Sequence, residues 1–426
     1  MNNFWLIAYL LLPSPTAQIA APVEAAAIRL EGARVLRPAG NGWSEGLTLH
    51  ISDGRIDVAG DDERAGDGAQ VIDLEGLYLI PGLIDLHTHL TLIPYNERSW
   101  NDQVLKDSLE LRTIKAVSGA RATLEAGFTT IRELGTEGAG YADVALRDAA
   151  QSGWIAGPRI FAATRALVAT GCYGPSGFDP RWDMPKGAQV ADGPDGVRKA
   201  VREQIAAGAD WIKVYADYRR RPGDASTPTY SLEELRSIVD EATSAGLPVA
   251  AHASTDEAIR RAVEAGVRTI EHGTDVTAST LELMRAAGVA LCPTLMAGTS
   301  IARYRGWDGG APLPDRVVRM RGMFERALAS GVTIACGSDA GVFPHGANAR
   351  EIELMVEWGM SPEAALRSAT AVAAEVLGRG DELGRIENGY RADLVALAAD
   401  PLENIHALSE PVLVIQGGAL VLDRRR

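Results

Sequence analysis

The chain has 426 residues, of which 42 are Lys or Arg and 56 are Asp or Glu, so its formal charge is −14. A surface that binds nucleic acid is normally built from an excess of basic residues, so this charge disfavours nucleic acid as a partner. Apolar residues make up 46% of the chain and charged residues 23%, which is typical of a globular protein and excludes a disordered or fibrous one.

The N-terminal region contains an apolar run from Phe4 to Leu12, followed by prolines and small residues. This pattern is typical of a cleaved signal peptide, here residues 1–21, and predicts a periplasmic or secreted protein. The first basic residue is Arg29, so the usual positive n-region is missing, and a cytoplasmic chain with a frayed N-terminus is the alternative. No stretch reaches about 18 apolar residues, so we expect no integral membrane segment in the mature chain.

Both ends of the remaining chain carry short β-like runs that are separated by Gly and Asp turns. We expect residues 22–80 and 379–426 to build one small β-sandwich from both chain ends. The runs are Ile28 to Val35, Leu47 to Ile51 and Val71 to Leu74 on the N-terminal side, and Asp393 to Leu397 and Val412 to Ile415 on the C-terminal side.

Residues 81–378 alternate short apolar runs with amphipathic segments, which predicts an α/β protein with a (β/α)₈ barrel of the TIM type. An open doubly wound sheet is the main alternative, but it would show a GxGxxG turn after its first strand, and none occurs there. The predicted strands are Leu83 to Leu86, Thr129 to Ile131, Arg159 to Ala162, Trp211 to Val214, Pro248 to Ala251, Thr269 to Ile270, Val289 to Leu291 and Thr333 to Ala335. The predicted helices include Ser108 to Ala126, Val197 to Ala207, Ser231 to Ala245, Asp256 to Ala265 and Arg316 to Ser330.

Four of the seven histidines follow predicted strands. His87 and His89 are two residues apart at the end of the first strand, so the alternation of a strand turns both imidazoles to the same side. His252 ends the fifth strand, His272 ends the sixth, and Asp339 follows the eighth. A single histidine at a strand end is more often a hydrogen-bonded core or rim residue than a ligand. Because parallel barrel strands end at one face, however, all five side chains converge, and a shared metal explains them together.

Lys213 lies inside the apolar run WIKVY of the fourth predicted strand, where a free ammonium would lose its hydration. One interpretation is a buried stem whose head pairs with Glu133 or Asp210. The other is that burial and nearby cations lower the lysine pKa, so that the neutral amine adds carbon dioxide. The resulting carbamate offers two oxygens that can bridge two divalent ions. With the histidines in place, we favour the carbamate.

Seven segments carry a resemblance to known proteins: PGLIDLHTHL (81–90), GFTTIRELG (127–135), GADWIKVYA (208–216), VAAHA (249–253), IEHGT (270–274), GSDAG (337–341) and LGRIENGYRADLVAL (383–397). Together they resemble the metal-dependent amidohydrolase superfamily. Within it, they are most similar to the branch of imidazolonepropionase-like proteins and Xaa-Pro or Xaa-Arg dipeptidases. The resemblance runs from about residue 27 to the C-terminus, with the metal motifs in order.

The resemblance implies a distorted barrel with a β-sandwich flank and a pair of divalent ions, for which we expect zinc. His87, His89 and Asp339 would hold one ion, His252 and His272 the second, and carbamylated Lys213 would bridge them. A hydroxide held between two such ions is a strong nucleophile near neutral pH. Asp339 would act as general base and then as general acid toward the leaving nitrogen. We therefore expect hydrolysis of a C–N amide bond in a small molecule: a dipeptide, an N-acyl amino acid or a cyclic amide.

Three tyrosines and one histidine are candidates for contact with the substrate. Many relatives carry a TGGH-like loop after the third strand, whereas this chain has TGCYG, which places Tyr173 there. A tyrosine donates a hydrogen bond to an oxyanion or carboxylate but does not titrate near pH 7. Tyr215 and Tyr218 follow Lys213, and His345 follows Asp339, so all are expected on loops at the barrel mouth.

Two alternatives stay open. One is a mononuclear enzyme, with His87, His89, His252 and Asp339 on a single ion, Lys213 uncarboxylated, and a cyclic amide or amidine as substrate. The other is a non-catalytic barrel protein that has lost its metals, against which the intact ligand set argues. The sequence does not determine an oligomeric state, although a homo-oligomer would be unsurprising.

Overall fold

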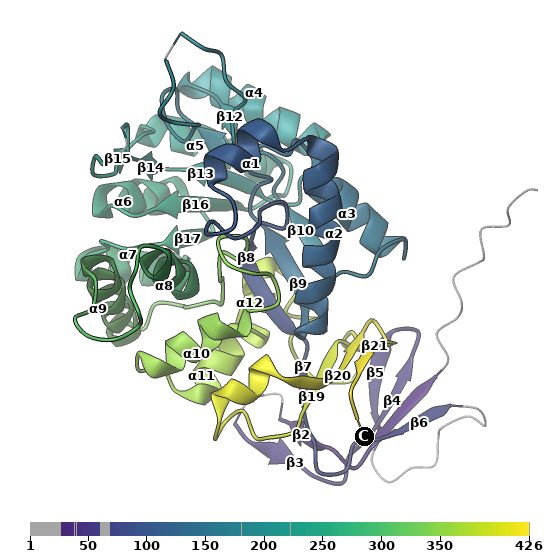
Figure 1. Ribbon diagram of the computed structural model, residues 1–426. Coiled ribbons are helices and arrows are strands. Elements are labelled where there is room, and N and C mark those ends of the chain that lie inside the picture. Colours follow the sequence, from purple (N-terminus) through teal and green to yellow (C-terminus); the bar gives the residue numbers. More distant parts are fainter. Residues whose placement is uncertain are drawn as a thin grey trace, which may run out of the picture.

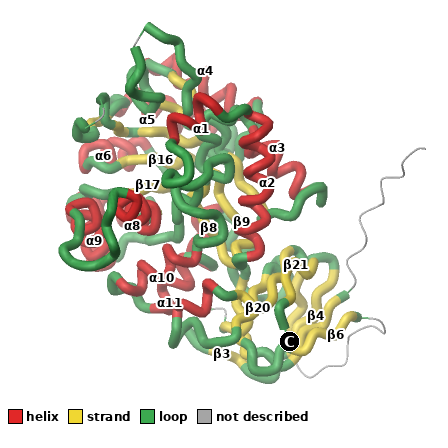
Figure 2. The backbone as a smooth tube through the Cα atoms, in the orientation of Figure 1, coloured by secondary structure: helices red, strands yellow, loops and turns green. Residues whose placement is uncertain are grey.

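The computed structural model describes residues 27–37, 39, 41–59, 69–179, 181–221 and 223–425. A large part, in which helices surround central strands, adjoins a smaller part made mainly of strands (Figures 1 and 2). The expected signal peptide, residues 1–21, lies outside the described residues. Within the described ranges, no helix has both the length and the apolar character needed to cross a membrane.

The large part is a barrel of parallel strands, and seven of the eight predicted runs are strands in the predicted order. Hydrogen bonding joins β8 to β9 and β9 to β10 in one sheet, and β11, β13, β16, β17 and β18 in another. The strands are β8 (Leu83–Thr88), β9 (Phe128–Glu133), β10 (Arg159–Ala162), β11 (Leu167–Val168), β12 (Gln189–Val190), β13 (Ile212–Tyr215), β16 (Val249–Ala253), β17 (Thr269–His272) and β18 (Ala290–Cys292).

The eighth position of the barrel is filled by an irregular segment, so the predicted strand Thr333 to Ala335 was wrong. The segment still closes the barrel, because Ala335 N donates to Leu291 O of β18 (3.0 Å) and Leu86 N of β8 donates to Cys336 O (2.9 Å). Extended backbone cannot continue because Asp339 adopts a left-handed conformation with φ +64°. Gly337 also lies so close to β8 and β18 that a Cβ there would be 3.0 Å from the Cβ atoms of His87 and Cys292.

Helices cover the outside of the barrel, and each of the five predicted helices is present. The α2 helix begins after Ser108, whose side chain accepts from Leu111 N, and α5 begins at a capping box formed by Ser231 and Glu234. The helices are α1 (Trp100–Lys106), α2 (Leu109–Glu125), α3 (Ala142–Gln151), α4 (Gly193–Ala206), α5 (Leu232–Ser244), α6 (Asp256–Ala265), α7 (Ala278–Ala287), α8 (Leu295–Tyr304), α9 (Asp315–Ser330), α10 (Ala349–Glu357), α11 (Pro362–Ser368), α12 (Ala371–Leu377) and the 3₁₀ turn η1 (Ile405–Ser409).

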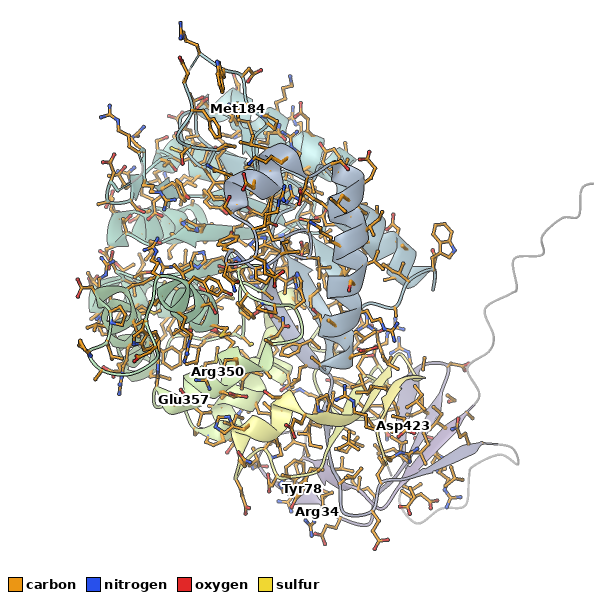
Figure 3. The ribbon with its side chains drawn as sticks, in the orientation of Figure 1. Arg34, Tyr78, Met184, Arg350, Glu357 and Asp423 are labelled. Atoms are coloured by element: carbon orange, nitrogen blue, oxygen red, sulfur yellow. The ribbon has the colours of Figure 1, made fainter. Side chains whose placement is uncertain are left out.

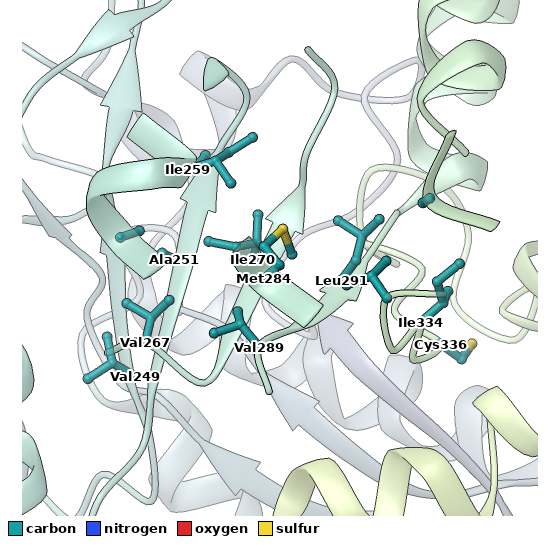
Figure 4. Packing of buried hydrophobic residues seen from close by; sticks show 14 of the residues in the cluster. Val249, Ala251, Ile259, Val267, Ile270, Met284, Val289, Leu291, Ile334 and Cys336 are labelled. Atoms are coloured by element: carbon teal, nitrogen blue, oxygen red, sulfur yellow. The ribbon is translucent and has the colours of Figure 1, made fainter. Parts of the chain in front are cut away.

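Strand alternation decides which side chains reach the barrel interior. On β16, Val249 and Ala251 pack against helix residues such as Ile259 in one cluster, which also holds Ile270 of β17 and Met284 of α7 (Figure 4). Ala250, between them, belongs to a separate cluster inside the barrel together with Trp211. Because successive side chains on a strand point to opposite faces, Lys213 and His252 take the interior side, two residues beyond Trp211 and Ala250.

The smaller part contains two sheets. The predicted run Ile28 to Val35 is divided at Gly32 (φ +78°) into β1 and β2, which lie in different sheets. Gly32 suits this turn because a left-handed backbone costs glycine little. One sheet has the order β5 (Arg55–Ala59), β4 (Thr48–Ser52), β1 (Ile28–Glu31) and β6 (Gln70–Asp73). The other has the order β21 (Ala419–Asp423), β20 (Pro411–Gln416), β19 (Leu394–Leu397), β7 (Tyr78–Pro81), β2 (Arg34–Leu36) and β3 (Trp43–Ser44).

Candidate metal centre and active site

The predicted ligands meet where the barrel strands end. Ligand atoms of His87, His272 and Asp339 all lie within 4.8 Å of one another. His89 Nε2 lies 3.3 Å from Asp339 Oδ1. The ring of His252 lies 4.6 Å from that of His272. Strands β8, β16 and β17 and the segment after residue 335 therefore bring the four imidazoles and the carboxylate to one place.

Three of these imidazoles are oriented by groups on their outer side. His89 Nδ1 lies 2.8 Å from Gly135 O. A carbonyl only accepts, so this nitrogen carries the proton, and Nε2 is left to face Asp339. His87 Nδ1 lies 2.8 Å from Glu271 Oε2, and His272 Nδ1 lies 2.7 Å from Thr294 Oγ1. Histidines that bind metals are usually held in this way, because the outer hydrogen bond fixes the tautomer and the ring direction.

Glu271 of β17 and Arg132 of β9 form a buried ion pair beneath the ligands. The distance from Arg132 Nη2 to Glu271 Oε1 is 2.9 Å, and both side chains are fully buried. Arg132 also donates to Leu86 O (2.6 Å) and lies over the ring of Trp211. The second oxygen of Glu271 faces His87, so this ion pair fixes the carboxylate that orients a ligand. The sequence analysis missed both residues, although Glu271 stands beside His272 in IEHG.

Lys213 on β13 points into the barrel and is 1% exposed. In the described part of the chain, no carboxylate oxygen lies within 4.0 Å of its Nζ. The partners considered from the sequence are engaged elsewhere: Glu133 accepts from Thr88 Oγ1 and Leu90 N, and Asp210 pairs with Arg147. Burial lowers the pKa of Lys213, although Glu271 and Asp339 partly oppose the shift.

The candidate ligands differ in the direction of their pKa shifts. Burial, and next the charge of Lys213, lower the pKa of His252 to about 3 and that of His87 well below its usual value. Burial also lowers the pKa of His89, but Asp339 and Glu137 outweigh it and raise the pKa to about 9. For Asp339, burial is outweighed by His87 and His89, so its pKa is lowered. Divalent metals bind neutral imidazoles and ionised carboxylates, so His89 would have to lose a proton when a metal binds, whereas His87, His252 and Asp339 already have the required protonation state.

Backbone strain is concentrated at the site. Five of the seven described non-glycine residues with positive φ lie at the site. A left-handed backbone costs a non-glycine residue on the order of 1–3 kcal/mol and persists where the surrounding structure enforces it. Here it aims ligand side chains that a regular strand end would not aim. The five residues are Glu137, Tyr173, His272, Thr294 and Asp339.

Asp85 connects the segments that carry two of the ligands. Its buried carboxylate accepts from His87 N (3.0 Å), Ser338 N (2.9 Å) and Asn348 Nδ2 (2.7 Å), and also from the Ser338 hydroxyl. Ser338 directly precedes Asp339. One side chain therefore fixes the end of β8 relative to the segment that closes the barrel.

Aromatic rings extend from the ligands toward solvent. Tyr215 stacks on His252 at 4.5 Å between ring centroids, and Tyr173 lies 4.2 Å from Tyr215. The buried carboxylate of Glu137, another residue that the sequence analysis missed, accepts from Tyr173 and from Trp100 Nε1. Tyr173 and Tyr218 line a cavity of about 520 Å³, so two of the expected substrate contacts face it.

His345 is placed differently from the expectation. Its Nε2 lies 3.0 Å from Leu92 O, and its ring packs against Gly119 of α2, where an added Cβ would be 2.7 Å from the ring. It is not among the residues that line the cavity, and burial lowers its pKa to about 4. The contact of His345 with substrate that the sequence suggested is therefore not supported: packing between α2 and the Leu92 segment holds the ring instead.

Comparison with known proteins decides the family. A model of the amidohydrolase family matches residues 78–421. The chain belongs to the amidohydrolase family. Members of this family are generally metal-dependent, and the chain is an enzyme that hydrolyses carbon–nitrogen amide bonds in small molecules, as the sequence predicted.

Several relatives of this amidohydrolase are characterised by name or structure. The chain is 32% identical to ochratoxinase from Aspergillus niger over 379 residues, which cover 80% of this chain and 75% of the relative. It is 26% identical to imidazolonepropionase from Streptomyces griseus, covering 87% of this chain and 91% of the relative. A crystal structure of an Xaa-Pro dipeptidase with bound methionine matches with a TM-score of 0.82 and 33% identity, covering 93% and 99%. The structure of the dipeptidase shares the TIM-barrel fold of this chain.

Proposed function

We propose that this amidohydrolase uses two divalent ions, zinc in the first instance, to cleave an amide bond next to a carboxylate-bearing amino acid. His87, His89 and Asp339 would hold one ion, and His252 and His272 the other. The observation that carries the proposal is the pre-orientation of His87, His89 and His272 by acceptors on their outer side. Outer hydrogen bonds of this kind are usual for histidines that bind metals, because they fix the tautomer and the direction of the ring.

Asp217 supports a role for His252 as a ligand. Asp217 Oδ2 accepts from Ser254 N and Thr255 N, whereas Oδ1 is buried without a hydrogen-bond partner. This Oδ1 lies 3.6 Å from His252 Nε2. A proton on Nε2 would face the oxygen and leave Nδ1 as the ligand atom. An unpaired buried carboxylate oxygen is costly, so a small ring movement that completes this bond on metal binding would be favourable.

Lys213 is the natural bridging residue, as a carbamate. Its amine is buried, has a lowered pKa and has no carboxylate partner among the described residues, so it loses its proton more readily than an exposed lysine does. Carbamylation replaces a buried amine with an anionic group able to contact two cations, which would balance the charge of the ions.

When bound, the ions supply an activated water and polarise the substrate carbonyl. Asp339 would accept the proton of the attacking water and deliver it to the departing nitrogen. Its carboxylate is ionised and suited to this role, because His87 and His89 hold its pKa below the usual value. Tyr218 would orient the substrate by donating a hydrogen bond, and the Tyr215 ring would pack over His252 and exclude water from it.

The relatives indicate the substrate class. We infer a dipeptide or an N-acyl amino acid, which fits relatives named Xaa-Pro dipeptidase and ochratoxinase. A cyclic amide is the second candidate, because imidazolonepropionase is also similar to this chain.

The two small sheets would form one β-sandwich unit, since Leu30 and Ile51 of one sheet share a hydrophobic cluster with Leu79 and Leu394 of the other.

The test is a hydrolysis screen of dipeptides, N-acyl amino acids and cyclic amides, run on protein whose bound metals have been counted. We expect about two divalent ions per chain and turnover of a linear amide. Full activity with about one ion per chain would favour the mononuclear alternative. The absence of hydrolysis of every amide by fully metallated protein would reject the proposal.

A further inference from the structure

The cavity beside the ligands has a basic lining in an acidic protein. It is bordered on one side by Tyr173 and Tyr218, and the Tyr218 ring lies 6.1 Å from the ring of His252. The described residues that line it include Lys186, Arg219, Arg220 and Arg221, and none of them is an Asp or Glu. The whole chain carries a formal charge of −14, so the charge of this lining is opposite in sign to that of the whole chain.

The three arginines lie in the connection between β14 (Asp217–Tyr218) and β15 (Thr227–Pro228). The first residue of β14 lies two residues after the end of β13. Arg219 is placed over the ring of Tyr218, 5.0 Å from its centroid, which limits the directions that the guanidinium can take. Among the described residues, no carboxylate oxygen lies within 4.0 Å of these three guanidinium groups. Lys186 has only a loose contact, 3.9 Å from the fully exposed Asp183.

Some arginines elsewhere on the surface are paired with carboxylates. Arg202 of α4 contacts Glu241 at 2.6 Å, and Arg321 of α9 contacts Glu325 at 3.1 Å. An unpaired run of three like charges repels itself, and an anion in the cavity would relieve that repulsion.

We propose that the cavity selects substrates with two carboxylates, so that the preferred amide is one formed by an acidic amino acid, aspartate or glutamate. This inference rests on the proposed function and names the substrate class of the same site. One carboxylate belongs to every dipeptide or N-acyl amino acid and would occupy only part of the lining. A second carboxylate, on the side chain, would contact the guanidinium groups of Arg220 and Arg221, farther along the loop.

The test compares ligands that differ only in one charge. Hydrolysis of N-acetyl-L-glutamate and N-acetyl-L-glutamine by the metallated enzyme gives a ratio of kcat/KM, and calorimetry with L-glutamate and L-glutamine gives a ratio of Kd that needs no turnover. We expect both ratios to favour the acid by on the order of tenfold at low ionic strength. The preference should decrease at 0.5 M NaCl, because the arginines are exposed to solvent.

The double variant Arg220→Gln with Arg221→Gln should bring both ratios close to one while leaving bound metal unchanged. Arg321→Gln, on α9 and outside the lining of the cavity, is the matched control and should leave both ratios at the wild-type value. Equal binding of glutamate and glutamine by the wild type, or a preference that survives in the double variant, would overturn the inference. If glutamate binds preferentially and no amide is hydrolysed, the proposed function fails and the substrate preference fails with it, while the selection of acidic ligands by the arginines is retained.

Discussion

Among the described residues of this enzyme, two clusters have the composition of a metal site, and their difference shows what such a site requires. The first consists of His87, His272 and Asp339 at the barrel end, and the second consists of Glu353, Glu357 and His406. In the second, Arg350 donates to both glutamates, and Arg350 and Glu357 lie side by side on the molecular surface (Figure 3). The guanidinium already forms ion pairs with both carboxylates, and the His406 side chain is 60% exposed. The first cluster is enclosed, and its imidazoles are aimed inward by outer hydrogen bonds.

A substitution of Asp339 tests most directly whether the first cluster is the functional one. Asp339→Asn keeps the size of the side chain but removes the proton acceptor and one anionic ligand. We expect kcat to fall by about 10³-fold or more, as general base and metal ligand are lost together. Steady-state kinetics with the best substrate of the screen measures the loss. Unchanged kcat would remove Asp339 from the mechanism and revive the non-catalytic alternative.

A smaller effect is expected beneath the ligands, at Glu271. Glu271→Gln weakens the acceptor for His87 and breaks the buried pair with Arg132, so metal affinity should fall by about 10–100-fold. Competition with a chelator, followed by metal analysis, measures the change. Glu357→Gln in the second cluster is the matched control and should leave the bound metal unchanged. The reverse result, with metal lost only in the control, would transfer the site to the second cluster.

The smallest effect on function is expected at Glu351, on the helix that also carries Arg350. Burial raises its pKa to about 8, although its carboxylate accepts from Leu295 N and Met296 N. The unfolded chain ionises near 4.5, so unfolding releases a proton between pH 4.5 and about 8. The free energy of unfolding therefore falls as pH rises in this window, by up to about 1.4 kcal/mol per pH unit from this group.

Glu351→Gln mimics the protonated acid and removes that contribution. Relative to the wild type, the variant should gain stability steadily from pH 5.5 to pH 7.5, while its kcat changes little. Urea unfolding at several pH values measures the trend. A constant difference between the two proteins across the window would show that Glu351 is ionised throughout.

Much of the barrel, and the convergence of the candidate ligands at its end, could be predicted because the chemistry coincides with local patterns. His87 and His89 obey the two-residue alternation of a strand, and Lys213 is conspicuous in an apolar run. Glu271, Arg132 and Thr294 were missed because their roles depend on partners far away in the chain. Arg132 and Glu271, for example, are 139 residues apart. A charged residue in a strand does not reveal its partner until the strands are placed side by side.

The errors have similar causes. Thr333 to Ala335 has the composition of a strand, but the nearby turn at Gly337 and the left-handed backbone of Asp339 leave only isolated bridges there. His345 was expected at the mouth because it follows Asp339, but Gly119 opens a space on α2 that its ring fills. Both cases depend on close packing between distant segments, which residue type alone does not specify.

The carboxylate of Asp85 has a consequence for how the enzyme is loaded. Because it joins the backbone of His87 to that of Ser338 through protein groups alone, we expect the proposed metal site to keep its shape when no cation is bound. Protein from which metal has been removed should then accept cobalt or manganese without being refolded. The ion bound in the cell would therefore depend on metal availability as well as on the geometry of the site.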